Sequence, residues 1–386
     1  MLTTAIKLKN FKIKKKISLR KIKKNLEILF DEKNYILESL KNKYRDSYSK
    51  KFINNYNKYK NFRVIGMGGS TLGTQTIYEF FKDKIKKNFH FIDNLSTKKI
   101  KIKNSQIVNL IVSKSGNTIE TIVNSNIYIK KGSKNIFITE NKNNYLFQLA
   151  SKLKSEIIHH NNYIGGRYSV LSEVGMLPAD LMGLKTRDFR QLNSLVKNKA
   201  FINSLINSVA STLYYLKNKK NNSIIINYDE KSENLLNWYQ QLVAESLGKN
   251  KSGLLPIVSN MPKDNHSVMQ LYLDGFKNNF FTFFYVKENN SLRVKNNKIL
   301  KSQSYLNNKS IDQIIFAQKQ ATENVFSKKN IPFRSFEVGK RDEKTLGELF
   351  CFFVLETILI GRSLKINPFD QPAVELIKTE TKKILS

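Results

Sequence analysis

Residues 106–118 read Gln106-Ile107-Val108-Asn109-Leu110-Ile111-Val112-Ser113-Lys114-Ser115-Gly116-Asn117-Thr118, and this stretch decides the fold. Its first seven residues form an apolar, β-branched run that is typical of a buried parallel strand. Residues 119–130, which follow it, have the apolar spacing of a helix. A buried strand that passes into a helix through a short loop predicts an α/β fold.

The loop between this strand and helix carries groups that suit a phosphate dianion. The first N–H groups of the helix are unpaired and point outward, and Gly116 permits a tight turn. Ser113, Ser115 and Thr118 can each donate an O–H. The alternative is an ordinary Ser/Thr helix cap. A second loop of similar character upstream favours the ligand-binding interpretation.

This second loop follows the short apolar strand predicted at residues 62–65. It reads Gly66-Met67-Gly68-Gly69-Ser70-Thr71-Leu72-Gly73 and leads into a helix that continues through Phe81. A glycine-rich turn between strand and helix holds the backbone close to a ligand. A dinucleotide fingerprint is the alternative, but the glycine spacing is wrong for it, and no acidic residue closes a following strand.

Alternating strands and helices predict two doubly wound parallel-sheet domains, which bind ligands at the carboxyl ends of their strands. We expect a helical lead-in over residues 1–56, with its helical pattern starting at Ile17, then domains at 57–190 and 191–386, the second with terminal helices. Further strands are expected at residues 89–92, 135–139, 156–159, 223–228, 254–258 and 280–286, with an edge strand at 333–338. Further helices are expected at residues 188–217, 346–364 and 370–385.

Composition limits the possible classes of protein. The chain has 386 residues and a formal charge of +35, but its lysines are scattered and no nucleic-acid-binding motif accompanies them, so we expect no nucleic-acid partner. The single cysteine, Cys351, lies in an apolar run and is expected to be buried. No stretch is long enough to span a membrane, and residues 1–24 lack the apolar core of a signal peptide. We therefore expect a cytoplasmic protein.

Four further segments carry residues that packing does not require. Arg167 follows two glycines in a loop too glycine-rich for regular structure, and Glu245 lies one helical turn after Gln241. His266 is placed at a probable helix start, and Lys378 in the second turn of a helix that follows Pro368. The alternatives are a surface ion pair for the arginine, a solvated glutamate and a capping histidine.

Taken in order, these segments resemble the glucose-6-phosphate isomerase family, which is built from two sugar-isomerase domains. The resemblance runs from Val64 to Lys378. Its six motifs are the loops at 66–73 and 113–118, Gly165-Gly166-Arg167, residues 241–249, His266-Ser267 with Gln270-Leu271, and residues 367–378.

The resemblance implies an aldose–ketose isomerase that acts on a sugar phosphate, needs no metal or other cofactor, and forms a homodimer in which the histidine reaches the neighbouring subunit's site. Glu245 resembles the proton-transferring base, Arg167 the residue beside the enediolate, and His266 with Lys378 the ring-opening pair. The implied substrate-binding residues are Gly68, Gly69, Ser70, Ser113, Lys114, Ser115, Thr118, Gly166 and Gln241.

The chemistry of the reaction agrees with these residue types. Moving a proton between C2 and C1 of the sugar requires a base such as a carboxylate, and a guanidinium stabilises the enediolate oxygen. Ring opening needs a proton donated to the ring oxygen and another removed from the C1 hydroxyl. A remote phosphate group supplies binding energy that fixes the reacting carbons.

Two other functions remain as alternatives. One is an isomerase for mannose or aminosugar phosphates on the same scaffold, and the other is a non-catalytic regulator that binds sugar phosphates. A regulator is expected to lose the base, the histidine or the lysine, and all three are present. The chain departs from the family pattern in its short length, its brief N-terminal region, and Asn117, where a threonine or another small residue is expected.

Overall fold

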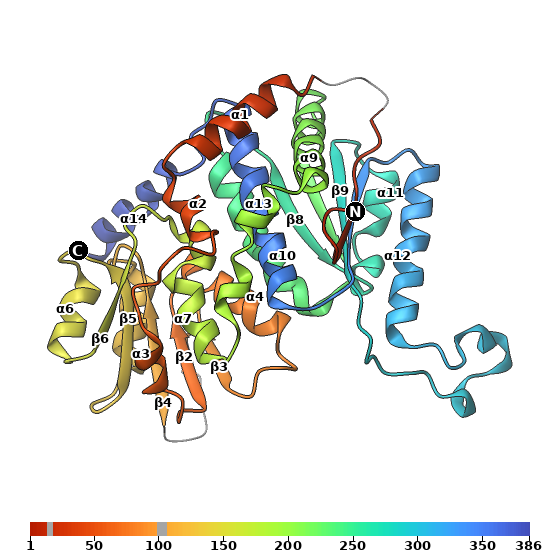
Figure 1. Cartoon of the computed structure of the whole chain (residues 1–386). Coiled ribbons are helices and arrows are strands. Elements are labelled where there is room, and N and C mark those ends of the chain that lie inside the picture. The colour runs from red at the N-terminus through yellow and green to blue at the C-terminus, as the bar shows by residue number, and fades with distance from the viewer. Residues whose placement is uncertain (14–17, 99–105) are drawn as a thin grey trace.

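The computed structural model describes residues 1–13, 18–98 and 106–386. Two five-stranded sheets lie on either side of a group of central helices (Figure 1). Strands and helices alternate along most of the chain, which confirms the predicted α/β class. Ile17, where the helical lead-in was expected to start, lies outside the described residues.

The first sheet has the strand order β3-β2-β4-β5-β6, and all of its neighbouring strands are parallel. β4 lies at its centre because its apolar residues can be buried on both faces. The five predicted strands of this half are confirmed. They are β2 (Asn61–Ile65), β3 (Asn88–Ile92), β4 (Ile107–Val112), β5 (Lys134–Glu140) and β6 (Glu156–His160).

The second sheet has the order β1-β10-β9-β7-β8, in which only β1 runs antiparallel to its neighbour. The four strands predicted in this half are present. The strands of this sheet are β1 (Ile6–Lys9), β7 (Asn222–Asn227), β8 (Leu255–Asn260), β9 (Asn279–Val286) and β10 (Phe333–Val338).

The prediction that residues 333–338 form an edge strand is wrong. β10 pairs with β9 on one side and with β1 on the other, so β1 is the edge strand. β1 alternates buried Ile6 and Leu8 with exposed lysines, which is the pattern of an edge strand with one buried face. It was not predicted, because four residues among many lysines give little periodic signal.

The N-terminal lead-in is less continuous than its helical pattern indicates. It contains three helices, because Asn34 and Ser49 each cap the start of a new helix with their side chains. Likewise, residues 188–217 are not one helical stretch, since Asn198 caps the long helix that starts at Lys199. The α-helices are α1 (Arg20–Asp31), α2 (Tyr35–Ser39), α3 (Lys50–Asn54), α4 (Leu72–Phe80), α5 (Ile119–Tyr128), α6 (Tyr145–Lys152), α7 (Glu173–Leu181), α8 (Leu192–Leu195), α9 (Lys199–Lys217), α10 (Glu233–Leu247), α11 (Met269–Asp274), α12 (Ile311–Lys328), α13 (Glu343–Ser363) and α14 (Pro372–Leu385).

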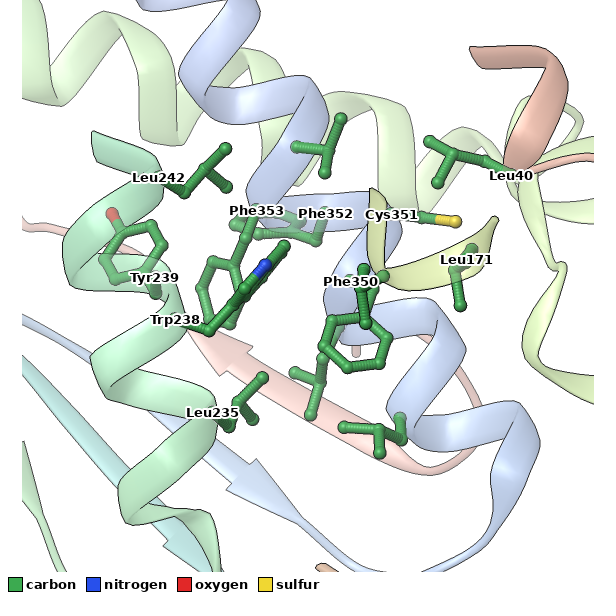
Figure 2. Packing of buried hydrophobic residues seen from close by; sticks show 14 of the residues in the cluster. Leu40, Leu171, Leu235, Trp238, Tyr239, Leu242, Phe350, Cys351, Phe352 and Phe353 are labelled. Atoms are coloured by element: carbon green, nitrogen blue, oxygen red, sulfur yellow. The ribbon is translucent and has the colours of Figure 1, made fainter. Parts of the chain in front are cut away.

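The central helices bind the two halves into one core. α10 packs on α4, which follows the first sheet's β2, and also on α13 and β8. Figure 2 shows Trp238 and Tyr239 of α10 facing the phenylalanines of α13, with ring centroids 4.9 Å apart for Trp238–Phe350 and 4.5 Å for Tyr239–Phe353. Each fully buried aromatic ring contributes about 2–3 kcal/mol. This packing holds the C-terminal end of α10 beside the first sheet.

α13 is buried along nearly its whole length, and the three carboxylates that it buries have hydrogen-bond or ion-pair partners. Cys351 is fully buried, as expected, and burial raises the pKa of its thiol to about 12. Glu356 pairs with Arg334 of β10, and Tyr239 donates a hydrogen bond to the same carboxylate at 3.2 Å. Among the described residues, no helix is both long and apolar enough to cross a membrane.

Candidate active site

The two hydroxyl-rich loops lie next to each other at the carboxyl edge of the first sheet. β2 and β4 are hydrogen-bonded neighbours, with Ile65 opposite Ile111, and each loop starts within two residues of that pair. The first loop forms the short 3-10 helix η1 (Gly68–Ser70). The loops therefore lie together at one edge of the sheet, as the alternation of strands and helices predicted.

The hydroxyls of the Ser113–Thr118 loop do not cap the helix that follows it. Thr118 occupies the cap position of α5 but accepts no hydrogen bond from that helix, and its hydroxyl lies 3.0 Å from that of Ser113. Gly116 has a φ of +65°, which favours glycine. Burial lowers the pKa of Lys114, whose charge a bound dianion would stabilise. The geometry argues against the capping alternative and favours anion binding.

The glycines of the other loop allow two backbones to touch. A Cβ on Gly69 would lie 2.3 Å from the carbonyl carbon of Gly166 and 2.5 Å from the Arg167 nitrogen. A Cβ on Gly68 would lie 2.8 Å from the Gln241 amide nitrogen, and Gly68 also has a φ of +51°. Glycine is needed here for close approach, and the contact brings the arginine and α10 against the loop.

Arg167 is 2% exposed and lies in the 3-10 helix η2 (Gly166–Leu171), so the expectation that this glycine-rich segment lacks regular structure is wrong. All five of its guanidinium hydrogens have acceptors. These acceptors are Ser246 Oγ at 2.8 Å, Glu245 Oε2 at 3.1 Å, Gln371 Oε1 at 2.7 Å, the Pro368 carbonyl at 2.8 Å and the Asp370 carbonyl at 3.1 Å.

Glu245 is held from two sides near the end of α10. Gln241, one turn earlier, donates to Oε1 at 2.8 Å, and Arg167 donates to Oε2 at 3.1 Å. The Glu245 side chain is 32% exposed, so solvent or a ligand can reach it. A fixed and accessible carboxylate next to a guanidinium can both accept a proton and have the resulting anion stabilised.

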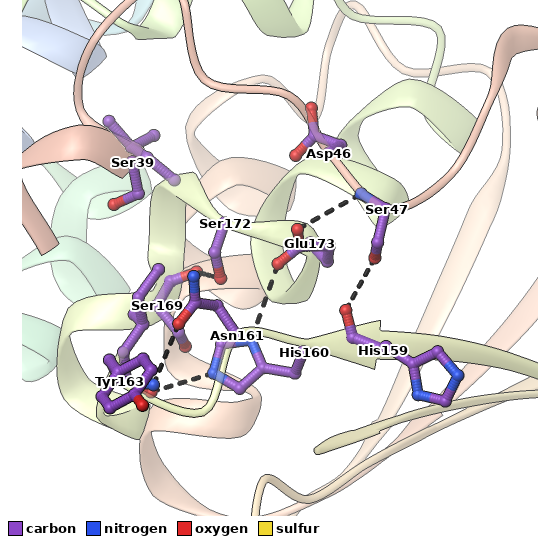
Figure 3. Close-up of polar contacts among 12 residues, drawn as sticks. Ser39, Asp46, Ser47, His159, His160, Asn161, Tyr163, Ser169, Ser172 and Glu173 are labelled. Carbon is purple, nitrogen blue, oxygen red and sulfur yellow. Dashed lines mark hydrogen bonds and ion pairs between the residues drawn. The ribbon is translucent and has the colours of Figure 1, made fainter. Parts of the chain in front are cut away.

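A buried polar cluster anchors the segment that carries Arg167 (Figure 3). Glu173, the first residue of α7, accepts a hydrogen bond from the Ser47 N–H at 3.3 Å, and its carboxylate lies 3.7 Å from His160 Nδ1. The other ring nitrogen of His160 lies 2.9 Å from the Ile164 carbonyl. These contacts tie Ile164, just before η2, and Glu173, just after it, to β6 and the N-terminal segment.

His266 and Lys378 take no part in the hydrogen bonds that join Arg167, Glu245 and Gln241 in the described part of the chain. His266 is exposed at the end of the 3-10 helix η5 (Lys263–His266), which follows the edge strand β8. Lys378 is exposed on α14 and pairs with Glu375 at 2.6 Å. Among residues 1–13, 18–98 and 106–386, neither side chain has a hydrogen bond or an ion pair with Glu245, whose partners are Arg167 and Gln241.

Four residues that sequence reasoning does not single out surround the arginine and the glutamate. Ser246 and Gln371 bond Arg167, Tyr168 bonds Ser246, and Lys249 bonds Asp370 at 2.7 Å. Three of them lie inside the motif segments 241–249 and 367–378, and this position was the signal by which the sequence could have identified them. Their partners come from distant parts of the chain, so only the folded structure reveals the contacts.

No cluster of three or more His, Cys, Asp or Glu side chains in the described part of the chain could hold a metal ion. The expectation of a reaction without a metal or cofactor stays a prediction.

Two parallel-sheet halves, a pair of anion-type loops and an adjoining carboxylate–guanidinium pair define the class of phosphosugar isomerases. The particular family follows from comparison with known proteins. The model of the phosphoglucose isomerase family matches residues 37–386, and the chain belongs to that family.

Relatives of known name agree with this family. The chain is 33% identical over 358 residues to a glucose-6-phosphate isomerase of Methanocaldococcus jannaschii, covering 85% of this chain and 84% of the relative. It is 30% identical over 359 residues to the glucose-6-phosphate isomerase of Campylobacter jejuni, covering 88% of each.

Solved structures support the fold. A hypothetical protein from Thermus thermophilus superposes with a TM-score of 0.83 at 22% identity, over 95% of this chain and 94% of that one. A glucose-6-phosphate isomerase from Chlamydia trachomatis has a TM-score of 0.69 at 19% identity, over 87% and 71% of the two chains.

Proposed function

We propose that this chain interconverts glucose 6-phosphate and fructose 6-phosphate by ring opening and proton transfer through a cis-enediolate. The observation that carries the proposal is the contact of Arg167 with Glu245 at 3.1 Å, beside two loops rich in hydroxyl and N–H donors. Membership of the phosphoglucose isomerase family supports the same reaction. No second function is favoured by a specific observation.

In this proposal the phosphate binds where the first sheet presents its donors. Ser113 and Thr118, with Ser70, Ser115 and Lys114 around them, supply O–H, N–H and ammonium groups. Binding energy released at the phosphate then fixes C1 and C2 of the sugar near the carboxylate.

Proton transfer in this proposal uses Glu245 as the base. It removes the proton from C2 of the aldose and returns it to C1, and the negative charge that develops on the substrate oxygens is stabilised by Arg167. Gln241 holds the other carboxylate oxygen through its bond at 2.8 Å, so the base keeps its orientation.

We propose that His266 and Lys378 open the sugar ring. In this proposal the chain forms a homodimer, and His266 reaches the active site of the second copy. Exposed apolar side chains support this assembly. In α14, Leu376 and Ile377 are each 70% exposed, and Leu292, Leu300 and Tyr305 are 81%, 77% and 68% exposed. These last three lie in residues 287–310, which extend away from the body of the molecule (Figure 1).

The domain division at residues 57–190 and 191–386 and a cytoplasmic location also remain proposals. The strand composition of the two sheets supports the division, although β1 joins the second sheet. A charged sugar phosphate does not cross an apolar bilayer unaided, which supports a location where such substrates are made.

The test is a coupled assay of the purified protein with glucose 6-phosphate and fructose 6-phosphate, in parallel with Glu245→Gln. We expect wild-type turnover without added metal, and a fall of about 10³-fold or more in kcat for the variant, because the amide cannot accept the proton. Binding of a non-reactive phosphate ester should change little, since the phosphate loops are intact.

Asn234→Gln in the first turn of α10 serves as a control on the same helix. Near-normal turnover of Glu245→Gln would contradict the assignment of the base. Higher kcat/KM for mannose or glucosamine 6-phosphate than for glucose 6-phosphate would contradict the proposed substrate.

A further inference from the structure

A closed ring of hydrogen bonds lies behind the guanidinium of Arg167. Arg167 Nε donates to Ser246 Oγ at 2.8 Å, Ser246 Oγ lies 2.8 Å from Tyr168 Oη, and Tyr168 Oη donates to the Pro368 carbonyl at 2.9 Å. Arg167 Nη2 donates to the same carbonyl at 2.8 Å, which closes the ring. Four residues from three distant segments of the chain thus meet around one side chain.

The direction of each bond in the ring follows from counting hydrogens. Tyr168 has one hydroxyl hydrogen, and it is given to the Pro368 carbonyl. The bond between the two hydroxyls must therefore be donated by Ser246, whose oxygen accepts from Arg167 Nε. From Arg167 Nε through Ser246 and Tyr168 to the carbonyl, every donor points the same way, an arrangement in which the bonds strengthen one another.

Burial makes this ring costly to disturb. Ser246 and Tyr168 are fully buried, and Arg167 is 2% exposed. Burial raises the pKa of Tyr168, so its hydroxyl stays a donor at neutral pH. An unpaired N–H of a buried cation would lose a strong hydrogen bond and gain none from water.

The ring leaves one nitrogen of the guanidinium free to exchange partners. Nε and Nη2 donate to the serine and to two main-chain carbonyls, whereas Nη1 donates to the side chains of Glu245 and Gln371. Gln371 is exposed and can move. A substrate oxygen can therefore take the place of Gln371 at Nη1 without breaking the ring.

We propose that Ser246 and Tyr168 are positioning residues for the isomerisation, because they orient Arg167 so that Nη1 faces the enediolate. They act through the arginine and do not touch the substrate. The inference rests on the proposed role of Arg167.

The test compares Ser246→Ala, Tyr168→Phe and the double variant. We expect kcat to fall about 100-fold for Ser246→Ala, which leaves Nε–H unpaired, and about tenfold for Tyr168→Phe, which acts one bond further away, with little change in KM. The double variant should resemble Ser246→Ala alone, because both changes open the same ring. Tyr228→Phe is the matched control, since it removes a buried tyrosine hydroxyl that lies 2.8 Å from Thr322 and takes no part in the hydrogen bonds of Arg167.

A second readout separates positioning from a general loss of structure. The inhibition constant is measured for a five-carbon aldonate 5-phosphate, whose carboxylate mimics the enediolate, and for sorbitol 6-phosphate, which has no such charge. We expect Ser246→Ala and Tyr168→Phe to weaken binding of the aldonate phosphate about tenfold and to leave binding of sorbitol 6-phosphate unchanged. If Ser246→Ala does not fold, Tyr168→Phe alone decides the outcome.

Arg167→Lys is the reference for the proposed function, because an ammonium cannot reproduce the donor geometry of the guanidinium. If Arg167→Lys weakens binding of the aldonate phosphate but not of sorbitol 6-phosphate, and the Ser246→Ala and Tyr168→Phe variants do not, the positioning inference is wrong while the role of Arg167 stands. If Arg167→Lys also leaves the aldonate unaffected, the proposed role of the arginine is itself wrong.

Discussion

Glu173 illustrates at the residue scale how a buried charge is kept near the site. The residue is 2% exposed. Burial by itself would raise its pKa, but the nearby imidazole of His160, with the hydrogen bond from Tyr44, outweighs burial and holds the pKa of Glu173 below its usual value. Nearby, the pKa of Asp46 is raised by burial in spite of its two bonds from Arg190. The carboxylate of Glu173 thus stays charged at neutral pH and is protonated only in acid.

Glu173→Gln tests this cluster through the dependence of stability on pH. A carboxyl whose pKa is lowered by folding stabilises the folded state above its unfolded pKa of about 4.3, and that stability is lost as the pH falls through the lowered value. We expect the variant to lose about 2 kcal/mol at pH 7 and to show a shallower decline below about pH 4.5. The effect is measured by the urea concentration at the midpoint of unfolding, determined for both proteins from pH 7 to below about pH 4.5.

Glu27→Gln on the exposed face of α1 is the control and should leave the pH profile unchanged. Parallel profiles of wild type and Glu173→Gln down to acid pH would mean that this carboxyl does not contribute the acid-sensitive stability.

At the scale of elements, α14 is held mainly through the segment before it. No residue of α14 itself is buried. Arg167 and Tyr168 bond the Pro368 carbonyl, and Lys249, just after α10, bonds the Asn367 carbonyl and pairs with Asp370 at 2.7 Å. This pair with Lys249 lowers the pKa of Asp370, so the link persists at neutral pH. The placement of Lys378 thus depends on contacts made before the helix begins.

Lys249→Met should loosen α14 without unfolding the protein. The Lys249–Asp370 pair is half exposed on the aspartate side, so we expect a stability change of about 1 kcal/mol or less. Amide hydrogen exchange should quicken across residues 372–385, and kcat should fall about tenfold if Lys378 assists ring opening. Lys340→Met, which removes an exposed pair with Asp342, is the matched control. Unchanged exchange in α14 would show that this anchor is not what holds it.

At the scale of the whole molecule, the candidate site is shared between the two halves of the chain. Arg167 and the anion-type loops belong to the first half, and Glu245 and Gln371 to the second. α10 and α13 make this possible, because one continuous core packs against both sheets. The proposed homodimer would explain why His266 is exposed just after β8, an edge strand of the second sheet, and has no hydrogen bond to Glu245 among the described residues.

Mixing two inactive variants tests the homodimer. Glu245→Gln and His266→Ala each lose activity alone, but a hybrid dimer would contain one site with an intact glutamate from one chain and an intact histidine from the other. Co-expression should restore up to about a quarter of wild-type activity, since half of randomly assorted dimers are hybrids with one complete site. Hybrids purified through two different tags should reach about half of wild-type activity, because each contains one complete site out of two.

Glu245→Gln mixed with Arg167→Ala is the control for this experiment. Those two residues contact each other within one chain, so no hybrid site is complete and activity should stay absent. A monomer in solution, or a dimer without recovered activity in the first mixture, would contradict the proposed role of His266.

Much of the fold could be predicted because its strands carry strong local signals. β4 and β9 are continuous apolar runs, and the glycine-rich and hydroxyl-rich loops mark where β2 and β4 end. β1 was missed because a four-residue strand has almost no periodicity of its own and is stabilised by pairing with β10, which is more than 300 residues away. Breaks such as Asn198 were missed because a helix cap is a weak signal beside a long apolar pattern.

The sequence by itself determined the α/β class and the places of the glycine-rich and hydroxyl-rich loops after β2 and β4, since these depend on local periodicity, and it carries the residue types that the proposed proton transfer needs. Only the tertiary structure decided that Arg167 meets Glu245, that Gly69 is required by the backbone of Gly166, and that Ser246 and Tyr168 close a ring behind the guanidinium. Such contacts join residues as many as 201 positions apart, as in the bond from Arg167 to Pro368. No local pattern encodes them, because they exist only when the central helices pack the two sheets together.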